Sequence, residues 1–139
     1  MRMSGIFDKT TEGLASSLNF RLLRHNITSA NVANAETPGY KAKKVDFEEA
    51  LARALDLDGT SSLNTLDKNH FVVGQGGLSK VQADVYDNPD VNVSNDGNTV
   101  DLEKEMASLA ENTILYKAAL QLINKKLGKL KYAVTEGNR

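Results

Sequence analysis

Five polar or glycine positions late in the chain match the spacing of a calcium-binding loop. They fall at the first, third, fifth, sixth and twelfth positions of that loop and are Asn92, Ser94, Asp96, Gly97 and Glu103. The match is incomplete, because asparagine replaces the usual first aspartate, serine is a weak ligand, and the nearby Pro89 argues against an entering helix. Asp96 and Gly97 are better explained as a turn, and we expect no metal.

Other reactive groups form no catalytic constellation. The glycine cluster at 74–77 lacks the Lys-Ser/Thr that completes a phosphate-binding loop. His25 and His70 share no ligand spacing, and the chain has no cysteine, which excludes disulfides and thiol nucleophiles. Carboxylates such as Glu48 and Glu105 fall on helix faces expected to be solvated. The sequence therefore predicts no enzyme, no cofactor and no small-molecule substrate.

The composition is that of a small soluble protein. The 139 residues are 40% hydrophobic and 25% charged with a net charge of −1, which predicts one modest domain and argues against nucleic acid as a partner. The N-terminus lacks the apolar run of a secretory signal, and no stretch reaches the ~20 apolar residues of a membrane span. We expect the chain to stay in the cytoplasm or to leave without a cleaved signal.

The last quarter of the chain carries the strongest structural pattern. Steps of four and three predict a long helix with a heptad seam, within a C-terminal segment 99–139. The seam residues are Leu102, Met106, Leu109, Thr113, Tyr116, Leu120, Ile123, Leu127, Leu130 and Val134. A weaker second stripe contains Ile114, Leu115, Ala118, Ala119 and Leu122. One intrachain partner cannot cover both stripes, so we expect neighbours on more than one side. Asn98 is predicted to cap this helix, with Asp101 in its first turn.

A second long helix is predicted near the N-terminus, from about residue 8 to 34. One apolar stripe includes Leu14, Leu18 and Leu22, and another includes Phe20 and Ile27. The helix must end before Pro38, because proline disfavours the α region at the residue before it, and Pro38-Gly39 suits a type II turn. This helix and its turn make an N-terminal segment 1–40, and we expect it to pair with the C-terminal helix.

The middle segment, 41–98, is predicted to contain a short helix and some β structure. Asp46 and Glu49 suggest the start of an amphipathic helix at 46–57. Residues 70–73 and the alternating residues 81–85 could form a hairpin around 74–77, in a region expected to be partly flexible. The predicted fold is thus mainly α, with paired long terminal helices of the coiled-coil type and a small β-containing middle.

Two sequence runs resemble the rod and hook family of bacterial flagellar axial proteins. The first, residues 29–41, reads Ser-Ala-Asn-Val-Ala-Asn-Ala-Glu-Thr-Pro-Gly-Tyr-Lys and is similar to the N-terminal signature of that family. Its motif and turn residues are Asn31, Asn34, Thr37, Pro38, Gly39 and Tyr40. The second run, 96–106, opens the C-terminal helix and resembles proximal rod members. The resemblance covers about residues 14–57 and 96–134.

The resemblance implies a structural subunit of the proximal rod in the flagellar basal body. Its helices would build a tubular drive shaft that links the membrane ring to later rod subunits and transmits torque. Implied partners are other copies of the chain, FlgC and other rod subunits, the FliE adaptor, the MS-ring protein and the type III export apparatus, which exports such proteins uncleaved. Phe47 with Leu51 is similar to an export signal, although such a pair also packs in ordinary helices.

The predicted assembly interface lies on the two terminal helices. Its residues are Leu14, Leu18, Leu22, Ile27, Leu102, Met106, Leu109, Tyr116, Leu120, Ile123, Leu127 and Leu130. One alternative is a cytoplasmic coiled-coil adaptor that binds a partner helix. Another is binding to a membrane surface through Lys125, Lys126, Lys129 and Lys131.

Overall fold

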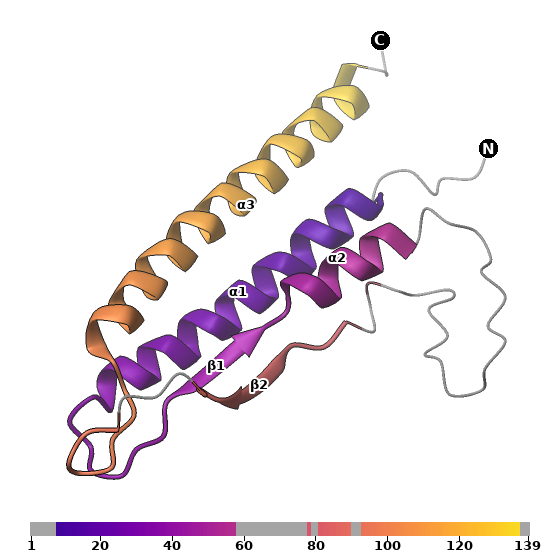
Figure 1. Cartoon of the computed structure of the whole chain (residues 1–139). Helices are drawn as coiled ribbons and strands as arrows, with labels where there is room; N and C mark the ends of the chain where they lie inside the picture. Colours follow the sequence, from indigo (N-terminus) through magenta and orange to yellow (C-terminus); the bar gives the residue numbers. More distant parts are fainter. Residues whose placement is uncertain (1–7, 58–77, 79–80, 90–92, 137–139) are drawn as a thin grey trace, which may run out of the picture.

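The computed structural model describes residues 8–57, 78, 81–89 and 93–136. Its elements follow in the order α1 (Lys9–Ala33), β1 (Lys43–Asp46), α2 (Glu48–Leu57), β2 (Asp84–Asp87) and α3 (Leu102–Glu136). The long helices α1 and α3 lie side by side and antiparallel, and α2 and the strands follow the other side of α1 in this view (Figure 1). The expected mainly α fold with paired terminal helices is confirmed.

Helix α1 begins with a well-formed cap and carries a glycine where α2 approaches it. The Asp8 carboxylate accepts hydrogen bonds from the Thr11 amide and hydroxyl, each at 3.0 Å. A Cβ on Gly13 would lie 3.1 Å from Cδ2 of Leu55. Glycine at this position therefore lets the two helices approach closely.

A small apolar core holds α2 and the strands against α1. Its buried residues are Val45, Phe47, Leu51, Ala54 and Leu78, with Phe20, Ile27, Val81 and Ala83 packed around them. The Phe20 and Phe47 rings stack with centroids 5.2 Å apart. In the part of the chain that the structure describes, this cluster contains no residue of α3. The longest helix therefore lies outside the core cluster.

The β structure differs from the sequence prediction. Strand β1, which we did not predict, pairs antiparallel with β2, placing Val45 opposite Val85. The alternating run at 81–85 becomes a strand only from Asp84, and the predicted first arm at 70–73 and turn at 74–77 lie outside the described residues. The prediction that Asp46 caps α2 was wrong, because Asp46 lies in β1, where its carboxylate accepts from the Tyr86 hydroxyl, and α2 begins at Glu48.

Helix α1 lies along the boundary between the two apolar stripes predicted for α3. The α3 residues buried there are Glu105, Asn112 and Ala119, which are spaced by seven and belong mostly to neither stripe. Both stripes are left partly exposed. The prediction that one intrachain partner cannot cover them is confirmed.

Candidate assembly site on the paired terminal helices

A buried asparagine joins α1, the chain that leaves it, and α3. Asn31 has no exposed surface. Its Nδ2 donates to the Lys43 carbonyl at 2.8 Å and to Glu105 Oε2 at 3.1 Å, while its Oδ1 accepts from the Lys43 amide at 3.1 Å and the Tyr40 hydroxyl at 3.2 Å. Every polar atom of this carboxamide is therefore satisfied without water.

A second buried asparagine holds the exit from α1. Asn98 Nδ2 donates to three carbonyls, those of Asn34 at 2.9 Å, Ala35 at 3.0 Å and Thr37 at 2.8 Å. The prediction that Asn98 caps α3 was wrong. Helix α3 begins at Leu102, so Asp101 takes that place and accepts from the Lys104 amide at 3.2 Å, whereas Asn98 Oδ1 accepts from the Val100 amide at 2.8 Å, before the helix starts.

The Pro38-Gly39 turn has the geometry expected from the sequence. The Tyr40 amide donates to the Thr37 carbonyl at 3.2 Å, and Gly39 has φ of 72°, as the third position of a type II turn requires. Asn34 ends α1 and accepts from the Thr37 hydroxyl at 3.2 Å. The chain thus turns sharply just after the helix.

Main-chain hydrogen bonds join this turn to the loop before α3. The Gly39 amide donates to the Asp96 carbonyl at 2.9 Å, and the Thr99 amide donates to the Tyr40 carbonyl at 3.0 Å. The Ala42 amide donates to the Thr99 hydroxyl at 2.8 Å. We call Asn31, Tyr40, Asn98, Thr99 and Glu105 the polar junction. It fixes the end of α1 against the start of α3.

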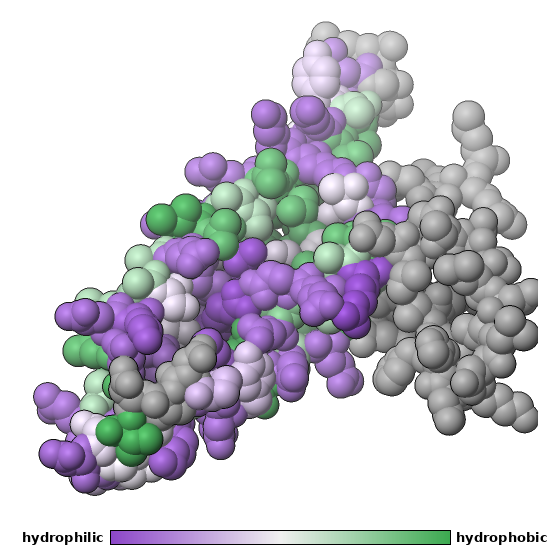
Figure 2. Space-filling model, in the orientation of Figure 1, coloured by the Kyte–Doolittle hydropathy of each residue, from purple (hydrophilic) through white to green (hydrophobic). Residues whose placement is uncertain are grey.

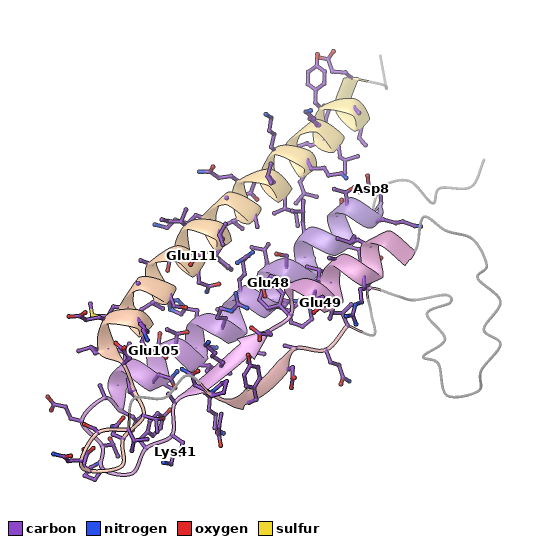
Figure 3. The ribbon with its side chains drawn as sticks, in the orientation of Figure 1. Asp8, Lys41, Glu48, Glu49, Glu105 and Glu111 are labelled. Atoms are coloured by element: carbon purple, nitrogen blue, oxygen red, sulfur yellow. The ribbon has the colours of Figure 1, made fainter. Side chains whose placement is uncertain are left out.

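Two polar contacts continue along the helix pair beyond the junction. Asn112 Nδ2 donates to the Arg21 carbonyl at 2.8 Å. At the opposite end of α1 from the junction, Lys126 pairs with Asp8, whose position at the start of α1 is marked in Figure 3. The hydrogen bond from Lys126, with help from the Thr11 amide, lowers the pKa of Asp8 from 3.8 to about 2. Helix α3 continues past this ion pair and beyond the start of α1 (Figure 1).

Arginines on α1 bind the sheet and α2. Arg24 donates to the Val45 carbonyl from Nη2 at 2.6 Å and to Glu48 Oε2 at 2.7 Å, with its guanidinium 4.6 Å from the Phe47 ring centroid. Burial alone would raise the pKa of Glu48, but the hydrogen bonds from Arg24 and from the Glu48 and Phe47 amides, together with the charge of Arg24, lower that pKa. Burial lowers the pKa of Arg21. These contacts fix the middle segment to α1.

The outer faces of the helix pair carry large exposed apolar side chains. Leu22 on α1 is 49% exposed, and Met106 and Leu122 on α3 are 57% and 56% exposed. Hydrophobic side chains gather along α3 in the space-filling view (Figure 2). A patch of this kind on a protein surface marks an interaction site.

The residues predicted for the assembly interface fall into three groups. Ile27 packs against the core of its own chain. Half-buried residues are Leu14, Leu18, Leu109, Tyr116, Ile123 and Leu130. Exposed residues are Leu22, Leu102, Met106, Leu120 and Leu127. The sequence analysis missed Thr99 and misassigned Asn98 and Glu105. Glu105 was expected on a solvated face, but it is buried and accepts from Asn31, because hydrophobic periodicity does not reveal polar contacts between helices.

Two hollows flank the α1–α3 contact. One, of about 160 Å³, is lined by Leu22 and His25 of α1 and by Asn112, Thr113 and Tyr116 of α3. The other, of about 600 Å³, separates α3 from β1 and has a polar lining that includes Lys43, Glu105 and Ser108. Among the described residues, no group of histidines and carboxylates could hold a metal ion.

Comparison with known proteins finds relatives of this chain by sequence. A family model described as flagella basal body rod protein matches residues 14–41. The flagellar basal body rod protein FlgB of Cereibacter sphaeroides is 40% identical over 120 residues, covering 86% of this chain and 89% of that protein. FlgB of Salmonella typhimurium is 34% identical, covering 88% and 90%, and FlgB of Bacillus subtilis is 32% identical, covering 95% and 98%. The chain belongs to the FlgB family.

FlgB proteins are structural proteins of the flagellar basal body rod and not enzymes, so the expectation of a non-enzymatic protein is confirmed by membership in this family. The run at 29–41 on which the resemblance rested falls entirely within the matched family region. None of the helices in the described residues is both long and apolar enough to cross a membrane.

Proposed function

We propose that this chain is a subunit of the proximal rod that assembles through its terminal helices into a tubular drive shaft. One observation carries the proposal: the polar junction holds α1 and α3 firmly together, while large apolar side chains on both helices remain exposed. A fixed helix pair with uncovered apolar faces is suited to bind other subunits. Each Å² of apolar surface covered is worth roughly 25 cal/mol.

The division of the chain follows from the same arrangement. Segment 1–40 supplies one packing helix and the turn, and segment 99–139 supplies the longer helix. The middle, 41–98, supports α1 through its core and its contacts with Arg24. The proposed assembly surface therefore comprises the exposed and half-buried apolar residues of the two terminal helices.

The proposed partners are other copies of the chain, FlgC and other rod subunits, the FliE adaptor and the MS-ring protein. In this role the chain links the membrane ring to later rod subunits and transmits torque. It would be exported through the flagellar type III apparatus without cleavage. By their names, the FlgB relatives support a place in the basal body rod.

Phe47 and Leu51, proposed for recognition by the export apparatus, are 2% and 9% exposed in the folded chain. Export recognition through them therefore requires a chain that has not yet folded around its core. The same pair serves the core after folding, so both roles fit one chain at different times.

Complementation tests the proposed function. The chain, carrying an epitope tag in the middle segment, is expressed in a motile bacterium whose own FlgB has been deleted. We expect swimming to return and the tag to appear in purified basal bodies. A chain that stays in the cytoplasm as a closed oligomer and never enters basal bodies would overturn the proposal and favour the adaptor alternative.

A further inference from the structure

Two lines of α3 residues, each with exposed leucines, flank the line that is buried against α1. The line of Glu105, Asn112 and Ala119 is buried against α1 and serves as the reference. Residues one position after each of these lie about 100° around the helix axis in one direction. Residues three positions after each of these lie about 60° around the axis in the opposite direction. The first line contains Met106, Thr113, Leu120 and Leu127. The second line contains Ser108, Leu115, Leu122 and Lys129.

The two hollows show which way each line faces. Thr113 lines the 160 Å³ hollow together with Leu22 of α1, on the side that we call the far side. Ser108 lines the 600 Å³ hollow together with β1, on the side that we call the sheet side. The far side thus offers an apolar hollow, and the sheet side offers Leu115 and Leu122, which are 40% and 56% exposed. The same helix carries both surfaces, one on each side of α1.

Charged residues at the edges of these surfaces favour contact between unlike sides. Glu103 and Lys117 border the far side, and Lys104 and Glu111 border the sheet side. Two parallel copies in register would place Glu103 beside Lys104, and Lys117 about 9 Å along the helix axis from Glu111, so each basic side chain has an acidic side chain of the other copy within reach. A two-fold contact between far sides would instead bring the Lys117 side chains together.

The contact is limited to the first part of α3. Between residues 123 and 131 both borders are basic, with Lys131 on the far side and Lys125 and Lys129 on the sheet side. Parallel copies therefore attract one another over about residues 102–122 and repel one another over about residues 123–131. The hollow at Leu22 and Tyr116 lies within the attractive region.

We infer that neighbouring copies pack side by side and parallel, with Leu115 and Leu122 of one copy seated in the far-side hollow of the next. The inference rests on the proposed function and names the contact through which copies join. Because the two surfaces differ, the contact is heterologous and each copy can bind one neighbour on either side. Such a contact extends along a row of copies and does not stop at a dimer.

Two complementary variants test this contact in solution. In one, Leu115→Glu with Leu122→Glu disables the sheet side, and in the other, Leu22→Glu with Leu120→Glu disables the far side. All four positions are exposed, so circular dichroism should match the unmodified chain. We expect each variant alone to sediment as a monomer and an equal mixture to form dimers and nothing larger. A dimer of either variant alone, or a mixture that stays monomeric where the unmodified chain associates, would overturn the inference.

A second measurement does not depend on assembly in solution. The chain has no cysteine, so Thr113→Cys and Leu115→Cys introduce the only thiols, at points on opposite sides of α3. In oxidised basal bodies the double variant should give a ladder of cross-linked chains. Co-expressed single variants should give dimers only, and each single variant expressed alone should give none.

The two proposals fail in different ways. A chain that never enters basal bodies contradicts the proposed function itself. A chain that enters them and restores swimming, but shows no cross-link or shows cross-links between identical positions, contradicts only the heterologous contact.

Charge reversal tests the borders of the contact. Lys117→Glu, added to the variant whose far side is intact, should weaken its association with the complementary variant several-fold. Glu111→Lys, added to that complementary variant, should restore the association.

Discussion

Two asparagines carry most of the polar junction because a carboxamide both donates and accepts. Asn31 uses its oxygen and its nitrogen for two hydrogen bonds each, and Asn98 directs its nitrogen at three carbonyls. Aspartate would keep the size of either side chain but lose the N–H donors. Alanine would leave buried carbonyls without partners, which costs more than the loss of an exposed hydrogen bond.

Replacing Asn98 by alanine should lower the free energy of unfolding by about 2 to 4 kcal/mol, because buried carbonyls at the α1 exit lose their donor. Urea denaturation followed by circular dichroism measures this change. Asn95 is exposed in the same loop, and Asn95→Ala should change stability by less than about 0.5 kcal/mol. Equal effects of the two substitutions would contradict the role given to Asn98.

Substitution by alanine should change the free energy of unfolding in opposite directions at two glycines that have no close neighbours. A Cβ added at Gly39 or at Gly128 would meet no heavy atom within 4 Å, so neighbours do not decide the outcome. Gly39 has φ of 72°, and Gly39→Ala should cost about 1 to 2 kcal/mol. Gly128 lies within α3, and Gly128→Ala should stabilise by about 0.5 to 1 kcal/mol. Thermal unfolding of the two variants gives the comparison, and the same sign for both would show that backbone conformation is not the cause.

At the scale of elements, the sequence allowed the long helices and the turn between 37 and 40 to be predicted, because apolar spacing and Pro-Gly chemistry are local signals. Strand β1 escaped prediction because four residues with one buried valine carry no clear alternation. Its partner β2 lies about forty residues later, and no local pattern reveals such pairing. Helix α3 was predicted as an element, but the line that meets α1 was not, since two of its three buried members are polar.

The ion pair between Asp8 and Lys126 should make the stability of the helix pair depend on pH. The folded-state pKa of Asp8 is lowered from 3.8 to about 2, so the stabilisation is fully present above pH 3.8 and is lost as the pH falls towards 2. Asp8→Asn keeps a good helix cap but removes the charge. Melting temperatures should therefore differ between the two proteins at pH 7 and converge near pH 2.

Lys126→Gln provides the matched control for this pH dependence. It should reproduce the effect of Asp8→Asn, and the double variant should be no less stable than either single variant, because one interaction is removed in all three. Added salt should shrink the difference, since Asp8 lies at the surface. A difference that persists unchanged at pH 2 would exclude the ion pair as its source.

At the scale of the whole molecule, stability and assembly depend on different surfaces. The core cluster lies between α1, the strands and α2, whereas most of the exposed large apolar residues lie on α1 and α3. Substitutions can therefore separate folding from assembly. A subunit needs this separation, because one set of apolar residues must form its own core and another must remain available for contacts with neighbouring subunits.

Leu127→Asp or Leu120→Asp should leave the monomer folded and block its assembly. These leucines are 41% and 38% exposed, so the free energy of unfolding should change by less than about 1 kcal/mol, while a charge buried between subunits would be uncompensated. Basal-body content and swimming measure assembly. Normal swimming with either variant would contradict the assignment of this face.

Phe47→Ala provides the contrasting case. Phe47 is 2% exposed in the core, and its truncation should cost about 3 to 5 kcal/mol of folding free energy. Chemical denaturation of the purified chain should show this loss directly. A small effect on folding together with a complete loss of assembly would mean that Phe47, not the outer leucines, belongs to the subunit contact.

The hydrogen bonds from Asn98 to the carbonyls of residues 34 to 37 span more than sixty positions of sequence. During synthesis, a ribosome must make roughly seven tenths of the polypeptide before this side chain exists to close the bend behind α1. Closure of that bend is consequently a late event with high contact order, and such contacts form slowly. Until residue 98 is made, the early part of the nascent chain therefore lacks the donor that fixes the α1 exit against the start of α3.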